Sequence, residues 1–143
     1  MVWAGWLYSQ EWWRKELWKT NPNTPTFESA VNRFRTRFIP GADANNLILQ
    51  MRTWEKHDVG TTPGFNGDTE RALHSIKVPI LYMPSETDLY FPIGDARYEA
   101  GFIPGVTFMP IPSLWGHTAG AASNPADAKF LNENISRFLV IKK

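Results

Sequence analysis

The chain has 143 residues, 43% hydrophobic and 20% charged, so it has the length of one ordinary domain and enough apolar side chains for a core. Fifteen basic and fourteen acidic residues leave a net charge of +1, which excludes a basic stripe for nucleic acid. No run approaches the roughly 18 apolar residues of a membrane span. No cysteine is present, which excludes disulfides, a thiol nucleophile and thiolate metal sites. We expect a cytoplasmic protein, because the first residues lack the basic region of a signal peptide.

The first half of the chain, residues 1–77, is predicted to be helical. Ser9 is placed to cap a helix over residues 10–19, with Glu11 in its first turn. Tryptophan is concentrated here. This density favours bulky side chains that pack into a core or an interface, and a surface that binds a ligand is the less favoured interpretation. Five of the seven tryptophans precede residue 19: Trp3, Trp6, Trp12, Trp13 and Trp18.

Two further helices and a loop are predicted before residue 77. Thr24 and Pro25 form a cap and first-turn pair for the second helix, which Pro40 and Gly41 end, and Asp43 opens the third. Residues 58–68 are rich in glycine and proline and predict a loop, followed by a short helix near 68–75. The apolar faces of the two longer helices carry Phe27, Val31, Phe34 and Phe38, and Leu47, Met51 and Trp54.

The second half, residues 78–143, changes its hydrophobic period. The runs 78–84 and 106–112 are short, apolar and rich in proline, which is typical of buried strands, and Pro110 predicts an edge strand or a bulge. A helix from Pro92 to Pro104 separates them, and a final helix covers 125–140. Its inward side is expected to carry Phe130, Leu131, Ile135, Phe138 and Leu139. This β-α-β-α order predicts an α/β fold with a right-handed parallel crossover.

Two polar side chains follow the predicted strands closely. Asp88 comes after the first strand and His117 after the second. Since the carboxyl ends of parallel strands meet at one edge, the carboxylate and the imidazole are expected within hydrogen-bonding reach, as in a hydrolase triad. The alternative is structural: Asp88 caps a turn and His117 is a partly exposed loop residue.

A resemblance to a known family rests on motifs spread along the chain. They are Val78-Pro79-Ile80-Leu81, Asp88-Leu89-Tyr90-Phe91-Pro92, Ile103-Pro104-Gly105, Ile111-Pro112-Ser113-Leu114-Trp115-Gly116-His117, Asn124-Pro125-Ala126-Asp127 and Phe130-Leu131, preceded by Asn45-Asn46-Leu47, Gln50 to Trp54 and His57 to Gly60. Together they resemble the C-terminal part of α/β-hydrolases of the homoserine O-acetyltransferase-like branch. The resemblance implies a partial α/β-hydrolase fold, with residues 1–77 as a helical lid and Asp88 and His117 as catalytic acid and base.

The sequence also departs from that family. The family's nucleophile elbow is a Gly-x-Ser-x-Gly turn after a central strand, and none occurs here. Ser85 and Ser113 are the serines near the proposed pair, and both are interpreted as loop or capping residues. Thr118 stands where the acetyltransferases usually carry an acidic residue, which places the chain nearer the hydrolase-like relatives.

No metal or cofactor site is predicted. His57, Asp58 and His74 lack the spacing of metal ligands, and His57 is expected to end or cap a helix. The glycines from Gly60 to Gly67 follow a helix rather than a strand, so they do not form a phosphate-binding loop.

Three functions remain open. The chain is a truncated hydrolase-like protein without catalytic activity alone and with an unknown binding role, or a hydrolase or acyltransferase half that needs a separate nucleophile-bearing partner. Alternatively, it is a small-molecule binding module whose aromatic helices form a pocket. We rank them in that order, because the elbow is missing.

The predicted strand 78–84 also has consequences for assembly. One of its edges has no partner strand in the predicted fold, and Ile80 to Met83 carry no charge that would protect it. We therefore expect a homodimer through this strand edge and the Trp-rich helices. A partner equivalent to the N-terminal half of a hydrolase is the alternative.

Overall fold

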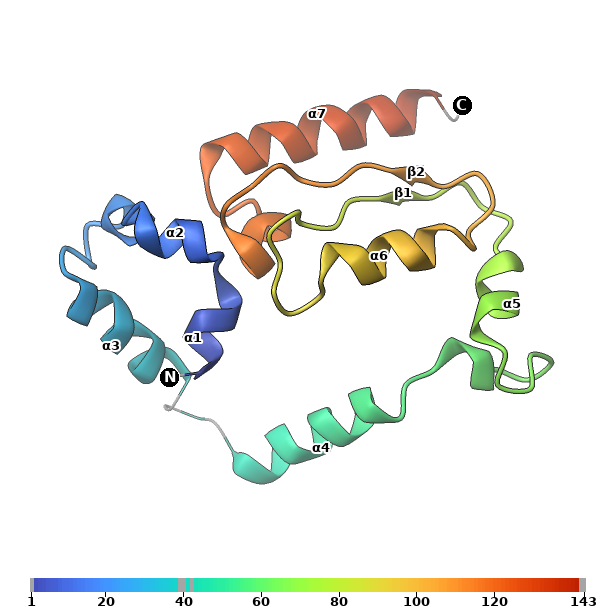
Figure 1. Cartoon of the computed structure of the whole chain (residues 1–143), viewed down its shortest axis with the longest axis horizontal. Coiled ribbons are helices and arrows are strands. Elements are labelled where there is room, and N and C mark those ends of the chain that lie inside the picture. Colours follow the sequence, from blue (N-terminus) through green and yellow to red (C-terminus); the bar gives the residue numbers. More distant parts are fainter. Residues whose placement is uncertain (1, 39–40, 42, 142–143) are drawn as a thin grey trace.

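The computed structural model describes residues 2–38, 41 and 43–141. Figure 1 shows three parts of the chain: the N-terminal helices at one end, an outlying stretch that contains α4 (Ala44–Glu55), and a body in which two strands lie beside α6 (Ile93–Ala100) and α7 (Pro125–Ile141). The elements are α1 (Val2–Leu7), α2 (Gln10–Arg14), η1 (Leu17–Thr20), α3 (Phe27–Phe38), α4 (Ala44–Glu55), η2 (Val59–Thr61), α5 (Thr69–His74), β1 (Leu81–Tyr82), α6 (Ile93–Ala100), β2 (Thr107–Phe108), η3 (Gly116–Ala121) and α7 (Pro125–Ile141).

The two strands form a parallel pair, as the β-α-β-α order predicts. Leu81 lies opposite Thr107, and the pairing continues through the amide of Ile111, which donates to the carbonyl of Pro84 at 2.8 Å. An isolated bridge between Ser85 and Ile111 extends it further. The chain therefore has an α/β fold with a parallel crossover through α6.

Both strands are shorter than the predicted ranges 78–84 and 106–112. Proline explains the difference, because it has no amide hydrogen to donate to a ladder, and both runs are interrupted or bounded by proline. The prediction for Pro110 is confirmed: the amides of Met109 and Ile111 on either side donate to β1, so position 110 faces the open edge of β2.

The predicted helix 10–19 is wrong in its second half. Ser9 does cap α2, with its hydroxyl accepting from the amide of Trp12 at 3.0 Å. However, α2 ends at Arg14, and Glu16 takes a left-handed conformation at φ 52° before the chain resumes as η1. Aspartate, asparagine or glycine is the usual residue in a left-handed conformation. Because position 16 is a glutamate, the sequence does not predict that the helix ends before it.

The tryptophans of the N-terminal region pack against one another. Trp12 and Trp18 are buried with Ala30 in a core cluster, and Tyr8 stacks on Trp12 with their ring centroids 3.8 Å apart. Burial is therefore confirmed for these two tryptophans. Trp6, in contrast, is exposed, and the side chain of Trp3 lies outside the described residues.

Two later helices differ from the predictions at their ends. The hydroxyl of Thr26, rather than that of Thr24, accepts from the first turn of α3, at the amide of Ser29, and α6 ends at Ala100 rather than at Pro104. Asp43 caps α4, its carboxylate accepting from the amide of Asn45 at 2.7 Å.

Ile135 and Leu139 of α7 are exposed, contrary to the prediction. The reason is that α7 has 17 residues, and a sheet of two short strands covers only part of its apolar face. Phe27 of α3 is likewise exposed, and the side chain of Phe38 and Pro40 fall outside the described residues.

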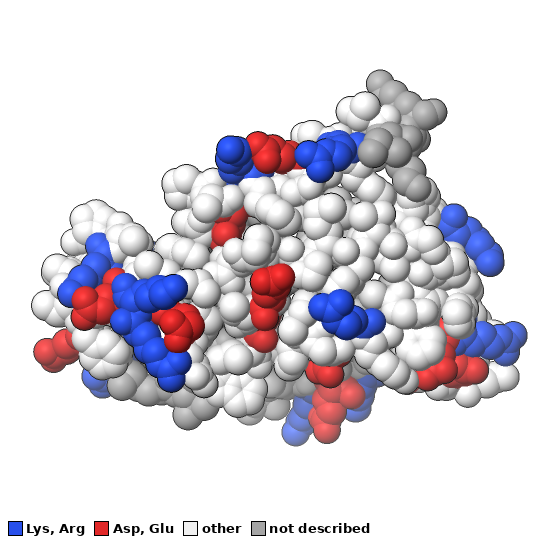
Figure 2. All heavy atoms as spheres, turned by 45° about the horizontal axis from the view of Figure 1, so that its top comes forward, with Lys and Arg blue, Asp and Glu red and all other residues white. Residues whose placement is uncertain are grey.

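Charges of both signs are intermingled on the surface. Figure 2 shows acidic and basic side chains side by side along α7 and among the N-terminal helices, with wide uncharged areas between them. In the part of the chain that the structure describes, no helix combines the length and apolar character needed to cross a bilayer.

The N-terminal segment packs directly on the loop that carries His117. The hydroxyl of Ser9 donates to the carbonyl of Leu114 at 2.6 Å. Gly116 has φ 55°, and a Cβ there would lie 2.7 Å from the carbonyl oxygen of Leu7. Glycine is therefore required at 116 both for its conformation and for the close approach of residues 7–9.

We predict that Gly116→Ala lowers the free energy of unfolding by about 2 kcal/mol or more, since it adds a strained backbone and a clash with backbone atoms. Gly120→Ala is the matched control in the same 3-10 helix, because a Cβ there meets nothing within 4 Å. Urea denaturation of both variants measures the difference. Equal stabilities would contradict the role assigned to Gly116.

Candidate acid–base site

Asp88 is held in place by its own turn. One carboxylate oxygen, Oδ1, accepts hydrogen bonds from the amides of Tyr90 at 2.7 Å and Phe91 at 3.1 Å. An aspartate that bonds to the backbone two and three residues ahead forms a compact turn, which fixes its rotamer. The side chain is only 9% exposed, and its other oxygen, Oδ2, points to His117.

His117 lies against that second oxygen. Its Nδ1 is 3.0 Å from Oδ2 of Asp88, so the prediction that the two side chains are within hydrogen-bonding reach is confirmed. Because an ionised carboxylate can only accept, the neutral imidazole must carry its proton on Nδ1. Nε2 is then left with a free lone pair, in a side chain that is 34% exposed.

Two aromatic rings flank the imidazole. The ring centroid of Tyr90 lies 5.0 Å from that of His117, and the ring of Phe91 lies at 5.4 Å. Both residues belong to the turn that Asp88 organises. The same turn therefore orients the imidazole by a hydrogen bond and restricts its ring by packing.

Thr87 joins the two loops, and sequence reasoning missed it. Its hydroxyl donates to the carbonyl of Ser113 at 2.7 Å and accepts from the amide of Gly116 at 3.2 Å. These bonds connect the loop of Asp88 to the loop of His117, because Thr87 directly precedes Asp88 and Gly116 directly precedes His117. The only signal in the sequence was a hydroxyl residue beside the aspartate, which is too common to single out.

The two nearby serines are structural, as the sequence interpretation held. Ser113 is buried, and its hydroxyl donates to Oδ2 of Asp127 at 2.7 Å and accepts from the amide of Trp115 at 3.1 Å. The hydroxyl of Ser85 accepts from the amide of Thr87 at 3.4 Å. Because Ser113 donates its only hydroxyl proton to Asp127, that proton is not directed at His117. Asp127, to which no role is assigned from the sequence, anchors this loop to α7.

The residues considered for a metal are separate. Asp58 caps η2, and a hydrogen bond from the hydroxyl of Thr69, together with one from the amide of Gly60, holds the pKa of its carboxyl below the usual range. His57 follows the end of α4, as predicted, with its amide donating to the carbonyl of Trp54. His74 lies in α5 against the ring of Phe102. Among the described residues no three metal-ligating side chains converge.

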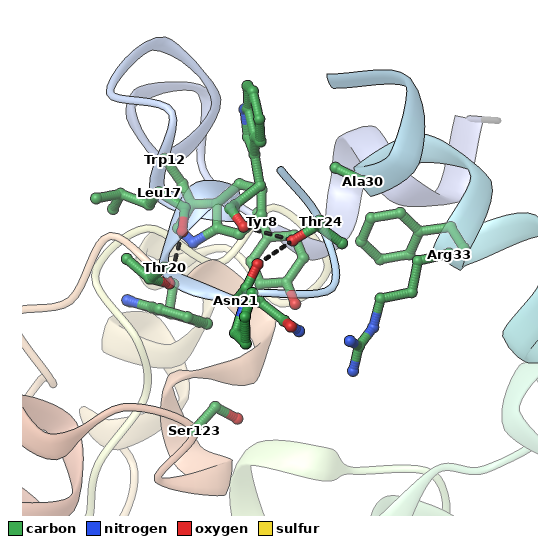
Figure 3. A pocket seen from close by; sticks show the side chains of 13 residues that line it. Tyr8, Trp12, Leu17, Thr20, Asn21, Thr24, Ala30, Arg33 and Ser123 are labelled. Carbon is green, nitrogen blue, oxygen red and sulfur yellow. Dashed lines mark hydrogen bonds between the residues drawn. The ribbon is translucent and has the colours of Figure 1, made fainter. Parts of the chain in front are cut away.

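An aromatic cavity of about 380 Å³ lies beside the His117 loop. Its walls include Tyr8, Trp12, Trp18 and Trp115, and Figure 3 shows Arg33 extending from α3 across from Asn21. Within the described ranges 2–38, 41 and 43–141, no ion pair involves Arg33. The cavity therefore combines aromatic rings with polar side chains and one positive charge.

Comparisons with known proteins agree with this geometry. No model of a protein family matches the chain. A probable esterase from Corynebacterium glutamicum is 30% identical over 116 residues, which are 81% of this chain and 32% of that protein. The acetyl esterase MekB superposes with a TM-score of 0.86 at 26% identity, over 97% of this chain and 39% of that one. The chain resembles part of an α/β-hydrolase.

Two further comparisons are with a homoserine O-acetyltransferase and with an acetylester hydrolase. A homoserine O-acetyltransferase from Cyclobacterium marinum is 32% identical over 77 residues, 54% of this chain and 21% of that protein. An acetylester hydrolase from Corynebacterium glutamicum superposes with a TM-score of 0.78 at 27% identity, over 90% of this chain and 36% of that one. This α/β-hydrolase-like chain thus spans a third or less of the length of the curated relatives that it matches.

We predict that the neutral imidazole of His117 is protonated at Nδ1, because Oδ2 of Asp88 accepts that proton. Asp88→Ala should abolish the preference, whereas Asp95→Ala on the exposed first turn of α6 should leave it intact. Long-range ¹⁵N–¹H NMR of the imidazole nitrogens distinguishes the tautomers. A protonated Nε2 in the unaltered chain would contradict the assignment.

Proposed function

We propose that Asp88 and His117 are the acid and the base of an ester-hydrolysing or acyl-transferring site whose nucleophilic serine comes from outside these 143 residues. The observation that carries the proposal is the 3.0 Å bond between Nδ1 and Oδ2, which leaves Nε2 free on a partly exposed ring. Both residues follow parallel strands at their carboxyl ends, where α/β proteins place their sites.

The chemistry follows from this orientation. Nε2 of His117 accepts the proton of the serine hydroxyl while the serine oxygen attacks the acyl carbonyl carbon, and the resulting imidazolium donates that proton to the leaving alcohol. Nε2 then removes a proton from water, or from an acceptor alcohol, whose oxygen attacks the carbonyl carbon of the acyl-enzyme. The imidazolium returns this proton to the serine oxygen as the acyl–serine bond breaks, and the carboxylic acid or the new ester leaves. Asp88 keeps the tautomer correct and stabilises the imidazolium in both halves of the reaction.

The supporting facts favour hydrolysis of a short acyl ester over transfer to an alcohol. Two solved structures similar to this chain are described as an acetyl esterase and an acetylester hydrolase, and a probable esterase matches 81% of this chain. Thr118 after His117 is consistent with that preference, since the acetyltransferases usually carry an acidic residue there. An acetyl ester is accordingly the substrate class that we propose.

The 143-residue chain alone should neither react with a serine-directed fluorophosphonate nor hydrolyse p-nitrophenyl acetate through His117. The physical reason is that, among residues 2–38, 41 and 43–141, no serine combines an aligned base with a site for the oxyanion. Labelling and hydrolysis by the chain, compared with those of His117→Ala, test this. Stoichiometric labelling that disappears in His117→Ala would overturn it.

The aromatic cavity supports a second candidate function, the binding of a planar aromatic anion. The partly exposed rings of Tyr8 and Trp115 offer apolar surface, and Arg33 offers a guanidinium for a carboxylate. Binding here would be detectable without enzymatic activity, because tryptophans line the cavity.

We predict that 1-naphthoate quenches the tryptophan fluorescence of the chain in a saturable manner. Arg33→Met should raise the dissociation constant about tenfold, which corresponds to about 1.4 kcal/mol and is typical for loss of one charge-assisted hydrogen bond. Arg35→Met, an exposed change on the same helix outside this cavity, is the control. Equal affinities for both variants would refute the role of Arg33.

A further inference from the structure

Helix α4 exposes its large apolar side chains. None of its residues is buried, and five large apolar side chains are 50% to 64% exposed: Leu47, Ile48, Leu49, Met51 and Trp54. A helix of 12 residues is marginal in water, and in proteins its stability comes mainly from packing of an apolar face. The composition of α4 therefore fits a helix that another surface covers.

This apolar surface continues to the candidate site. The ring of Trp54 lies 6.3 Å from that of Phe91, and Phe91 lies 5.4 Å from His117. Phe91 is itself 54% exposed. A partner that covers α4 would thus also contact the turn of Asp88 and come close to Nε2 of His117.

One edge of β1 is also available for pairing. The carbonyls of Ile80, Tyr82 and Pro84 accept from β2, so the backbone groups of the alternate residues Leu81 and Met83 face the opposite edge. In the described part of the chain the sheet has two strands only, and no strand lies along that edge. An unpaired edge of this kind is a template for a strand of another segment.

We propose that the docking surface, defined as Leu47, Met51 and Trp54 of α4 with Phe91 and the free edge of β1, binds the polypeptide that carries the nucleophilic serine. This inference rests on the proposed function, and it identifies the surface to which the serine-bearing polypeptide binds. A strand of that polypeptide would pair with Leu81 and Met83, and its apolar face would cover α4.

Two observations favour this occupant over a second copy of the chain. The chain superposes on 39% of the acetyl esterase MekB at a TM-score of 0.86, so most of that protein lies outside the matched part and is available to cover such a surface. A second copy would cover α4 but would contribute only another acid–base pair. A serine-bearing partner covers the same surface and completes the site.

The test is site-specific photo-cross-linking in cells that produce the protein natively. Benzoylphenylalanine replaces Met51 on the docking surface or, as a matched control, Leu139 on α7, since these apolar side chains are 58% and 63% exposed. After irradiation, cross-linked polypeptides are treated with a biotinylated fluorophosphonate, and the joined peptides are mapped by mass spectrometry. We expect a fluorophosphonate-reactive polypeptide joined at position 51 and none at position 139.

A charge on the docking surface gives a second measurement. Met51→Glu should reduce the amount of fluorophosphonate-reactive polypeptide that co-purifies with the chain by at least tenfold, because the carboxylate would be desolvated. Leu139→Glu should leave it unchanged, and circular dichroism of both variants checks that they fold.

Each other outcome has a distinct meaning. A reactive polypeptide that co-purifies but is joined at position 139, or is insensitive to Met51→Glu, overturns the docking surface and leaves the proposed function standing. Absence of any reactive polypeptide contradicts the proposed function and the docking surface with it. Two copies of this chain joined through position 51 overturn the proposal in favour of the homodimer predicted from the sequence.

Discussion

The parallel pairing of residues 80–86 with residues 107–111 is the constraint on which the candidate site depends. It aligns the two strand ends, so that the loops that follow leave the sheet at the same place. Thr87 then joins those loops through two hydrogen bonds, and Asp88 and His117 meet at 3.0 Å. The pair is thus positioned by backbone pairing, which depends little on the identity of surface side chains.

The N-terminal helices pack against the loop that carries His117. Residues 7–9 approach Gly116 so closely that only glycine fits, and Ser9 bonds to the carbonyl of Leu114. Trp115 lies against Tyr8 and Trp12, which connects the loop to the aromatic core cluster. Packing in the tryptophan-rich region therefore fixes the backbone one residue before the catalytic candidate His117, and the helical half of the chain contributes to the geometry of the site.

In the described part of the chain, the imidazole of His117 is oriented by Asp88, and no serine hydroxyl is bonded to it. Ser113 bonds to Asp127 instead, and the rings of Tyr90 and Phe91 lie against His117. In the proposed function, another segment brings a hydroxyl to Nε2. The chain is similar to esterases over roughly a third of their length.

The residue pattern alone determined the α/β class, the parallel strand order and the proximity of Asp88 to His117, because these follow from strand order and from the shared edge of parallel strands. It also determined the caps of α2 and α4, which are local interactions of Ser9 and Asp43. Only the tertiary structure decided that α2 ends at Arg14, that Ile135 and Leu139 stay exposed and that Thr87 and Asp127 hold the loops. The reason is physical: a left-handed turn at Glu16, the width of the sheet under α7 and hydrogen bonds between residues 14 or 26 positions apart depend on contacts that no local sequence pattern contains.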